Sequence, residues 1–121
     1  MMRMSVENKT DQQKCKSILD LPEIRFAGFL DYMGNLIEGD FKTGLSPLKD
    51  ENERKKMFIE AVLRIRTRQD FDNNLGSVEY AAARRKNIVT MTIPFVDKVL
   101  FISADPTVDI DQIAKKILDL L

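Results

Sequence analysis

Residues 48–75, with the sequence LKDENERKKMFIEAVLRIRTRQDFDNNL, contain neither glycine nor proline and decide the fold. Acidic side chains open this stretch at Asp50, Glu51 and Glu53, and arginines close it, which suits the dipole of a helix. The turn cluster at residues 73–76 marks its end. We therefore predict one long helix of about twenty residues in the middle of the chain.

The apolar side chains of this helix cover a wider arc than contact with a single sheet requires. At about 100° per residue, the apolar positions within residues 57–65 spread over about 240° of the helix circumference. A helix lying on a sheet needs only a narrower stripe, formed here by Phe58, Ala61, Val62 and Ile65. Ile59 and Leu63 point away from that stripe, so we expect a second apolar contact for them.

Strand patterns lie on both sides of the long helix. Before it, residues 24–31 and 36–41 are separated by a short polar break that contains Gly34, which predicts a hairpin. After it come three further runs joined by short separators, which predict an antiparallel meander. These runs are residues 77–83, 88–95 and 99–104.

A helix is predicted near each end of the chain. Within residues 10–21, apolar side chains recur at helical spacing until Pro22, which cannot continue a helix. Near the other end, Asp109 and Gln112 resemble a capping box, and apolar residues then repeat at helical spacing as far as Leu121. Residues 1–9 are polar and mixed in charge, so we expect them to be flexible.

Composition limits the classes of function. The 121 residues suit one domain, and 19 basic against 19 acidic residues give a net charge of zero, which argues against a nucleic-acid partner. There is no histidine and only one cysteine, so metal centres and Ser-His or Cys-His nucleophiles are not expected, and we predict no cofactor. No apolar run approaches the ~20 residues of a membrane span, and we expect a cytoplasmic protein.

The order of the predicted elements resembles that of Roadblock-type dynein light chains, a fold close to the longin and profilin architectures. The likeness rests on the opening strand at residues 25–30, the hairpin at 33–36, the loop at 44–48 and the pair Arg84-Arg85. These strings are also similar to short archaeal proteins of unknown function. The resemblance covers residues 18–121, and its motifs are structural rather than chemical.

This resemblance implies an α+β domain over residues 10–121, with elements in the order α-β-β-α-β-β-β-α. Its five-stranded antiparallel sheet would have strand order 2-1-5-4-3, with the long helix on one face and the terminal helices on the other. Roadblock-like proteins usually pair through the long helix and the third strand, and many serve as platforms for small Ras-like GTPases. The expected homodimer interface comprises Ile59, Leu63, Arg66, Tyr80 and Ala82.

Two classes of function fit these observations. The first is a non-enzymatic homodimeric interaction or regulatory module. The second is a small-ligand sensor of PAS-like type, which requires a closed apolar pocket of ~300 Å³ or more between helix and sheet. PAS domains place several short helices between their second and third strands, whereas one continuous helix is predicted here, so the first class is favoured.

Other clusters of functional residue types have simpler structural explanations. A basic patch for an acidic partner would combine Arg64, Arg68, Arg84, Arg85 and Lys86, but a solvated hairpin tip is the favoured interpretation. The carboxylates Asp31, Glu38 and Asp40 surround the first hairpin and are expected to be solvated rather than catalytic. We expect Cys15 to be a buried small hydrophobe. The small side chains at residues 80–83 fit either a partner subunit or the long helix of the same chain.

The glycines at positions 34, 39 and 44 raise the question of a phosphate-binding loop. Gly34 and Gly39 have the spacing of such a loop, but Asp40 and Phe41 stand where lysine and serine or threonine are required. We interpret Gly34 as a hairpin turn, Gly39 as a close approach or bulge between strands, and Gly44 as the start of a loop.

Overall fold

A computed structural model describes residues 9–42 and 50–121, so Gly44 and most of the segment expected to be flexible lie outside the described residues. The described elements follow the predicted order, with one short additional helix. They are α1 (Asp11–Leu19), β1 (Ile24–Leu30), β2 (Leu36–Phe41), α2 (Glu51–Gln69), α3 (Asp72–Leu75), β3 (Ala81–Arg84), β4 (Val89–Phe95), β5 (Lys98–Ala104) and α4 (Ile110–Leu120).

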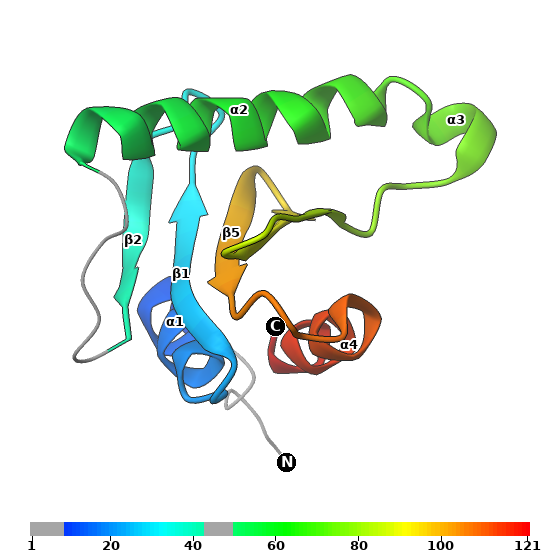
Figure 1. Ribbon diagram of the computed structural model, residues 1–121. Coiled ribbons are helices and arrows are strands. Elements are labelled where there is room, and N and C mark those ends of the chain that lie inside the picture. Colours follow the sequence, from blue (N-terminus) through cyan, green and yellow to red (C-terminus); the bar gives the residue numbers. More distant parts are fainter. Residues whose placement is uncertain (1–8, 43–49) are drawn as a thin grey trace, which may run out of the picture.

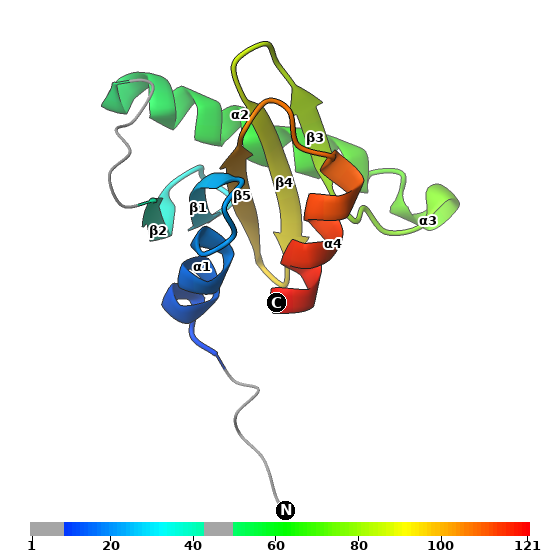
Figure 2. The same ribbon diagram turned by 60° about the horizontal axis from the view of Figure 1, so that its bottom comes forward.

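The five strands form one antiparallel sheet in the order β2-β1-β5-β4-β3. The long helix α2 crosses one face of this sheet, while α1 and α4 lie on the other face (Figures 1 and 2). The predicted α+β class, strand order and placement of the helices are therefore confirmed.

Each face of the sheet carries its own apolar core. Between α2 and the sheet, the buried stripe of the helix packs against one side of β1 and β5. The members from α2 are Phe58, Ala61, Val62 and Ile65, as predicted from the sequence. On the other face, α1 and α4 cover a larger core that includes Phe29, Met91 and Leu100. Burying each such large side chain contributes about 1.5–3 kcal/mol, so both faces stabilise the sheet.

Polar caps fix where the helices begin. Thr10 accepts a hydrogen bond from the N–H of Gln13, whose side chain accepts one from the Thr10 N–H in return. Asp50 caps α2 through the Glu53 N–H at 2.9 Å, and Asp109 caps α4. Such caps are worth about 1 kcal/mol each.

The third strand is shorter than predicted. The sequence indicates a strand from residue 77, yet β3 begins at Ala81, and the expected turn before it contains the single-turn helix α3. Ala81 pairs with Thr92 of β4, so a longer β3 would run past Pro94 of the same strand. Proline has no N–H to donate, which prevents the ladder from continuing there.

The glycines of the first hairpin have the predicted roles. Gly34 has a φ of +81° and lies in the turn between β1 and β2. Gly39, with a φ of +147°, faces Gly28 across the two strands, and a Cβ at Gly39 would stand 2.3 Å from the Gly28 Cα atom. The close approach of β1 and β2 therefore requires glycine at position 39.

Candidate interaction surface

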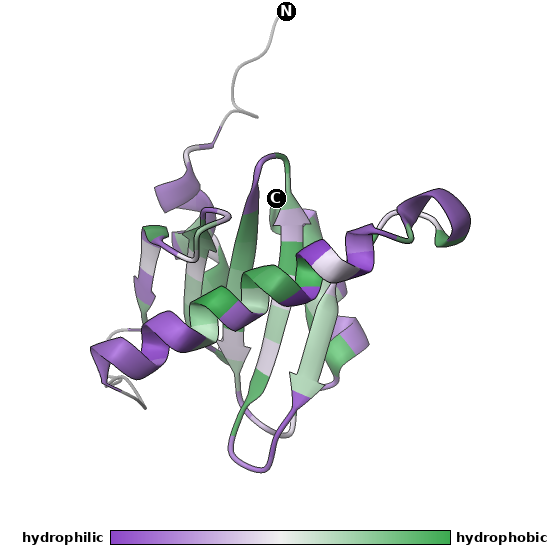
Figure 3. Cartoon of the chain, turned by 90° about the horizontal axis from the view of Figure 1, so that it is seen from above, coloured by the Kyte–Doolittle hydropathy of each residue, from purple (hydrophilic) through white to green (hydrophobic). Residues whose placement is uncertain are grey.

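The side of α2 that faces away from the sheet carries exposed apolar side chains. Ile59 is 40% exposed and Leu63 is 56% exposed, and neither belongs to the cores on the two faces of the sheet. Figure 3 shows hydrophobic residues along the middle of α2, between hydrophilic ends. We call Ile59 and Leu63, together with the exposed Tyr32 and Met33 of the neighbouring β1–β2 turn, the apolar outer surface.

The β1–β2 turn is fixed against α2. Gly34 lies so close beneath Ile59 that a Cβ added to the glycine would be 2.7 Å from the Ile59 Cγ1 atom. The Arg66 guanidinium lies 4.6 Å from the centre of the Tyr32 ring, a cation–π contact. Lys55 donates a hydrogen bond to the side-chain oxygen of Asn35. These contacts hold the apolar outer surface in one arrangement without a partner.

Asp31 organises this turn. Its carboxylate accepts hydrogen bonds from the backbone N–H groups of Met33 and Asn35, both at 2.9 Å, and from the Asn35 side chain at 3.1 Å. A carboxylate used in this way is a structural acceptor and not a free acid or base. Within residues 9–42 and 50–121, no three carboxylate or cysteine side chains gather as a metal site would require.

The carboxyl group of Asp31 should titrate below its ordinary range. The Asn35 backbone N–H, followed by the Asn35 side chain, the Met33 N–H and Lys55, lowers the pKa of this carboxyl from its ordinary value of 3.8. The hydrogen bonds favour the charged form, so they persist above that value and are lost as the pH falls through the lower folded pKa. Amide shifts of Met33 and Asn35 should therefore titrate with a midpoint below 3.8. A midpoint at or above that value would show that these bonds do not form.

The free edge of β3 lies on the side of the sheet opposite β2. β3 pairs with β4 alone among the strands of the described residues. The Arg85 N–H donates to the Ile88 carbonyl across the hairpin. Because inward and outward groups alternate along an antiparallel strand, the N–H groups of Ala82 and Arg84 point to the free edge. An edge of this kind can pair with a further strand.

The predicted interface residues divide between the two faces of the sheet. Ile59, Leu63 and Arg66 lie together on α2, whereas Tyr80 and Ala82 are on the face that α4 covers. The Tyr80 hydroxyl donates to the Asp111 carboxylate of α4, and this bond raises the tyrosine pKa. Only the edge of β3 connects the two groups of residues. The small Ala81 side chain packs into the core beneath α2, which favours the explanation from the same chain at that position.

The predicted basic residues do not form one patch. Arg84 turns toward α4, where its guanidinium donates to the backbone carbonyls of Pro106 and Val108. Arg85, the next residue, lines the opposite face together with Arg64 of α2. Arg64 also pairs with Glu60 at 3.2 Å, and Arg68 donates to the Arg64 carbonyl at 3.0 Å. The alternation of side chains along β3 separates Arg84 from Arg85.

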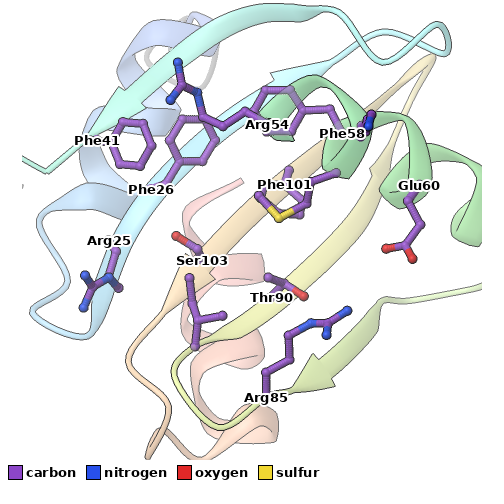
Figure 4. A pocket seen from close by; sticks show the side chains of 13 residues that line it. Arg25, Phe26, Phe41, Arg54, Phe58, Glu60, Arg85, Thr90, Phe101 and Ser103 are labelled. Atoms are coloured by element: carbon purple, nitrogen blue, oxygen red, sulfur yellow. The ribbon is translucent and has the colours of Figure 1, made fainter. Parts of the chain in front are cut away.

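A trough of about 360 Å³ lies between α2 and the sheet, on the side of α2 where Arg85 is found (Figure 4). Phenylalanine side chains form its walls, and arginines lie around it. The sequence did not indicate this trough, because its residues come from α2, from the β3–β4 turn and from four strands, β1, β2, β4 and β5. Lipophilic walls beside charged groups are typical of sites for small molecules.

Cys15 is buried at the contact of α1 with the sheet and is 3% exposed. Burial, reinforced by the nearby carboxylates of Asp11 and Glu38, raises the thiol pKa from 9.0 to about 11. The thiolate is the nucleophile, so a thiol with this pKa is almost entirely unreactive at neutral pH. The sequence-based interpretation as a small hydrophobe is confirmed.

We therefore predict that Cys15 resists the disulfide reagent DTNB at pH 8 in the folded protein. The raised pKa of the thiol and its burial both slow its reaction with DTNB. Addition of urea should release the full thiol signal, with a rate that follows unfolding. Complete labelling within seconds of mixing with native protein would contradict this account.

The helices of the described residues show no candidate for a membrane crossing, since none is both long enough and apolar enough.

Several solved structures share this fold at low sequence identity. A Roadblock/LC7 domain from Streptomyces avermitilis matches with a TM-score of 0.69 and 12% identity over 93% of this chain and 92% of that one. The gliding protein MglB of Thermus thermophilus matches with a TM-score of 0.67 and 13% identity, over 94% of this chain and 90% of that one. Schizosaccharomyces pombe profilin matches with a TM-score of 0.61 and 10% identity, over 91% of each chain. The predicted Roadblock-like, profilin-related fold is confirmed.

A sequence search of curated proteins gives no match. A family model, by contrast, matches residues 3–121. The chain therefore belongs to DUF6659, a family of unknown function.

Proposed function

We propose that this protein is a non-enzymatic, homodimeric interaction module of the cytoplasm, whose two copies meet through the apolar outer surface and the free edge of β3. The observation that carries the proposal is the exposure of Ile59 and Leu63 on a helix whose sheet-facing stripe is already complete. A helix needs no apolar residues on a side that remains in water.

The free energies of burial and association explain why the dimer needs both the apolar outer surface and the free edge of β3. Burying a whole leucine or isoleucine side chain contributes about 1.5–3 kcal/mol, so four half-exposed side chains from two copies contribute on the order of 3–6 kcal/mol. Association costs roughly 4–15 kcal/mol in lost translational and rotational freedom. Ile59 and Leu63 alone are therefore insufficient, and the exposed Tyr32 and Met33 together with strand pairing along β3 supply the remaining contacts.

The partner class is a further part of the proposal. The Roadblock resemblance implies a small Ras-like GTPase, and a dimer would present two copies of each exposed surface to such a partner. One neighbour of the same fold is described as MglB with a tetrameric arrangement, at 10% identity and a TM-score of 0.63. It supports the view that this fold is used for assembly.

Sedimentation equilibrium at protein concentrations of about 1–50 μM tests the dimer. A dimer that does not form in this range has a free energy of association below about 6 kcal/mol. The monomer mass is 13.9 kDa, and we expect twice that value. A mass that stays at 13.9 kDa throughout would refute the proposed function.

A further inference from the structure

The trough beside α2 has a defined floor. Phe41, Phe26, Ser103 and Thr90 are successive neighbours across β2, β1, β5 and β4, and their side chains share the α2 face of the sheet. The helix packs on Phe26 and on Phe101 of the next row. Ser103 and Thr90 therefore lie where the helix no longer covers the sheet and line the trough instead (Figure 4).

One wall of the trough is a preformed aromatic surface. The Phe26 ring centre lies 4.8 Å from that of Phe41 and 5.9 Å from that of Phe58. Phe58 in turn contacts Phe101 edge-on at 5.5 Å. Because these rings already pack on one another, an apolar ligand could lie on them without reorganising the core.

Positive charges dominate the surroundings of this wall. Arg25, Arg54, Lys56 and Arg85 line the trough, against a single acidic residue, Glu60. That carboxylate is already paired with Arg64 at 3.2 Å. In Figure 4, Arg85 lies beside Thr90, across the trough from Phe26 and Phe41. The net charge of the whole chain is zero, so this excess is local.

The floor also offers hydroxyl donors. Ser103 is buried and Thr90 is partly buried, and among the described residues neither side chain has a hydrogen bond at the trough. A hydroxyl group can donate to an anionic oxygen, and such charge-assisted bonds are about twice as strong as neutral ones. The trough therefore combines hydroxyl groups, a guanidinium and an aromatic wall.

We propose that this trough is a binding site for a small organic anion. The apolar body of the ligand packs on the phenylalanine wall, and its acidic group is held by Arg85 and the hydroxyls of Thr90 and Ser103. The volume of about 360 Å³ suits a molecule of one or two rings or a medium-length acyl chain. This site is separate from the apolar outer surface, which includes Ile59 and Leu63, so it adds a ligand to the proposed dimer and does not depend on it.

The test uses two fluorescent probes with the same aromatic body. One is the anion 8-anilino-1-naphthalenesulfonate, and the other is neutral N-phenyl-1-naphthylamine. We expect the anion to bind once per chain and about tenfold more tightly than the neutral probe, as one charge-assisted contact predicts. Amide shifts of the wild-type protein should change at Thr90, Ser103 and Phe101, which requires no substitution.

Two neighbouring residues provide matched variants. Arg85→Glu should weaken anion binding by about tenfold or more, because it reverses the charge at the trough. Lys86→Glu makes the same charge change at the next residue, which does not line the trough, and should alter binding by less than about twofold. Sedimentation is measured on both variants. Arg85 and Lys86 both follow the β3 edge directly, so an effect of the charge change on the dimer is expected in both variants, whereas loss of anion binding is expected for Arg85→Glu alone.

Three results would overturn the proposal. They are no saturable binding of the anion, equal losses in the two variants, and shift changes confined to the surface around Ile59 and Leu63. A fourth is a failure in competition: octanoate and benzoate are expected to displace the probe, and displacement by neither of them would exclude a small-anion site. Displacement by an acidic peptide but by neither carboxylate would assign the trough to a protein partner instead.

Discussion

Replacing Ile59 and Leu63 together by glutamate is expected to leave the domain folded and to convert the dimer into a monomer. Both side chains lie on the outward side of α2 and outside its core stripe. In a symmetric dimer the change would bury four carboxylates, and at about 1–3 kcal/mol or more for each unpaired charged group, association would weaken by about a thousandfold or more. Sedimentation velocity at micromolar concentration measures the loss, and circular dichroism confirms the fold.

The matched control replaces two other exposed apolar residues, Leu75 and Val96, by glutamate. They are 81% and 87% exposed and lie beyond α2, in α3 and in the β4–β5 turn. We expect this variant to remain folded and dimeric. If Ile59→Glu/Leu63→Glu remained dimeric, or if the control dissociated equally, the interface would lie elsewhere.

Gly39→Ala is expected to cause the largest loss of stability of any single substitution considered. A Cβ at this position would stand 2.3 Å from the Gly28 Cα atom and 2.4 Å from the Ala27 carbonyl oxygen, both of them backbone atoms. The φ of +147° adds conformational strain. We expect the free energy of unfolding to fall by about 3–5 kcal/mol, a large part of the ~5–15 kcal/mol typical of a domain. Urea unfolding followed by circular dichroism measures it.

Gly76→Ala separates backbone strain from steric clash. Gly76 also has a positive φ, +88°, but no atom lies within 4 Å of a Cβ built there. Its ψ of 163° places it in a region that is almost restricted to glycine, so its substitution should cost about 1–3 kcal/mol, from strain alone. A loss at Gly39 no greater than that at Gly76 would show that the close approach of β1 and β2 does not control stability.

The sequence was sufficient for those features that depend on local periodicity and chain order. The buried stripe of α2 follows from the spacing of Phe58, Ala61, Val62 and Ile65, and the structure has the same four residues facing the sheet. Gly34 and Gly39 could be interpreted because glycine has few other reasons to occur in a hairpin. The strand order came from the resemblance to a known fold and not from periodicity.

Features that depend on how strands align could not be predicted in this way. The short β3 reflects Pro94 on the opposite strand, and the separation of Arg84 from Arg85 depends on which face each residue occupies. Tyr80 is expected at the dimer interface, and the hydrogen bond of its hydroxyl to Asp111 of α4 is not visible in the spacing of residues along β3. Alternation along a strand implies that Tyr80 and Ala82 share a face opposite Ala81, but it does not tell which of the two faces α4 covers.

The trough was missed for a different reason. It depends on the line along which α2 crosses the sheet, which leaves Ser103 and Thr90 uncovered. The pattern of residues within a single helix or strand does not show where α2 crosses the sheet. The hydroxyl residues of two largely apolar strands, Thr90 and Thr92 of β4 and Ser103 of β5, were the only available signal.

The most direct test of the proposed dimer is a search for contacts between two copies in solution. An equimolar mixture of isotope-labelled and unlabelled protein is examined by filtered nuclear Overhauser spectroscopy, which reports only protons on different chains. We predict contacts between the methyl groups of Ile59 and Leu63 and the second copy. Absence of any contact between copies at a concentration of about 0.5 mM, where even weak dimers form, would contradict the account, as would contacts that involve Val96 but neither Ile59 nor Leu63.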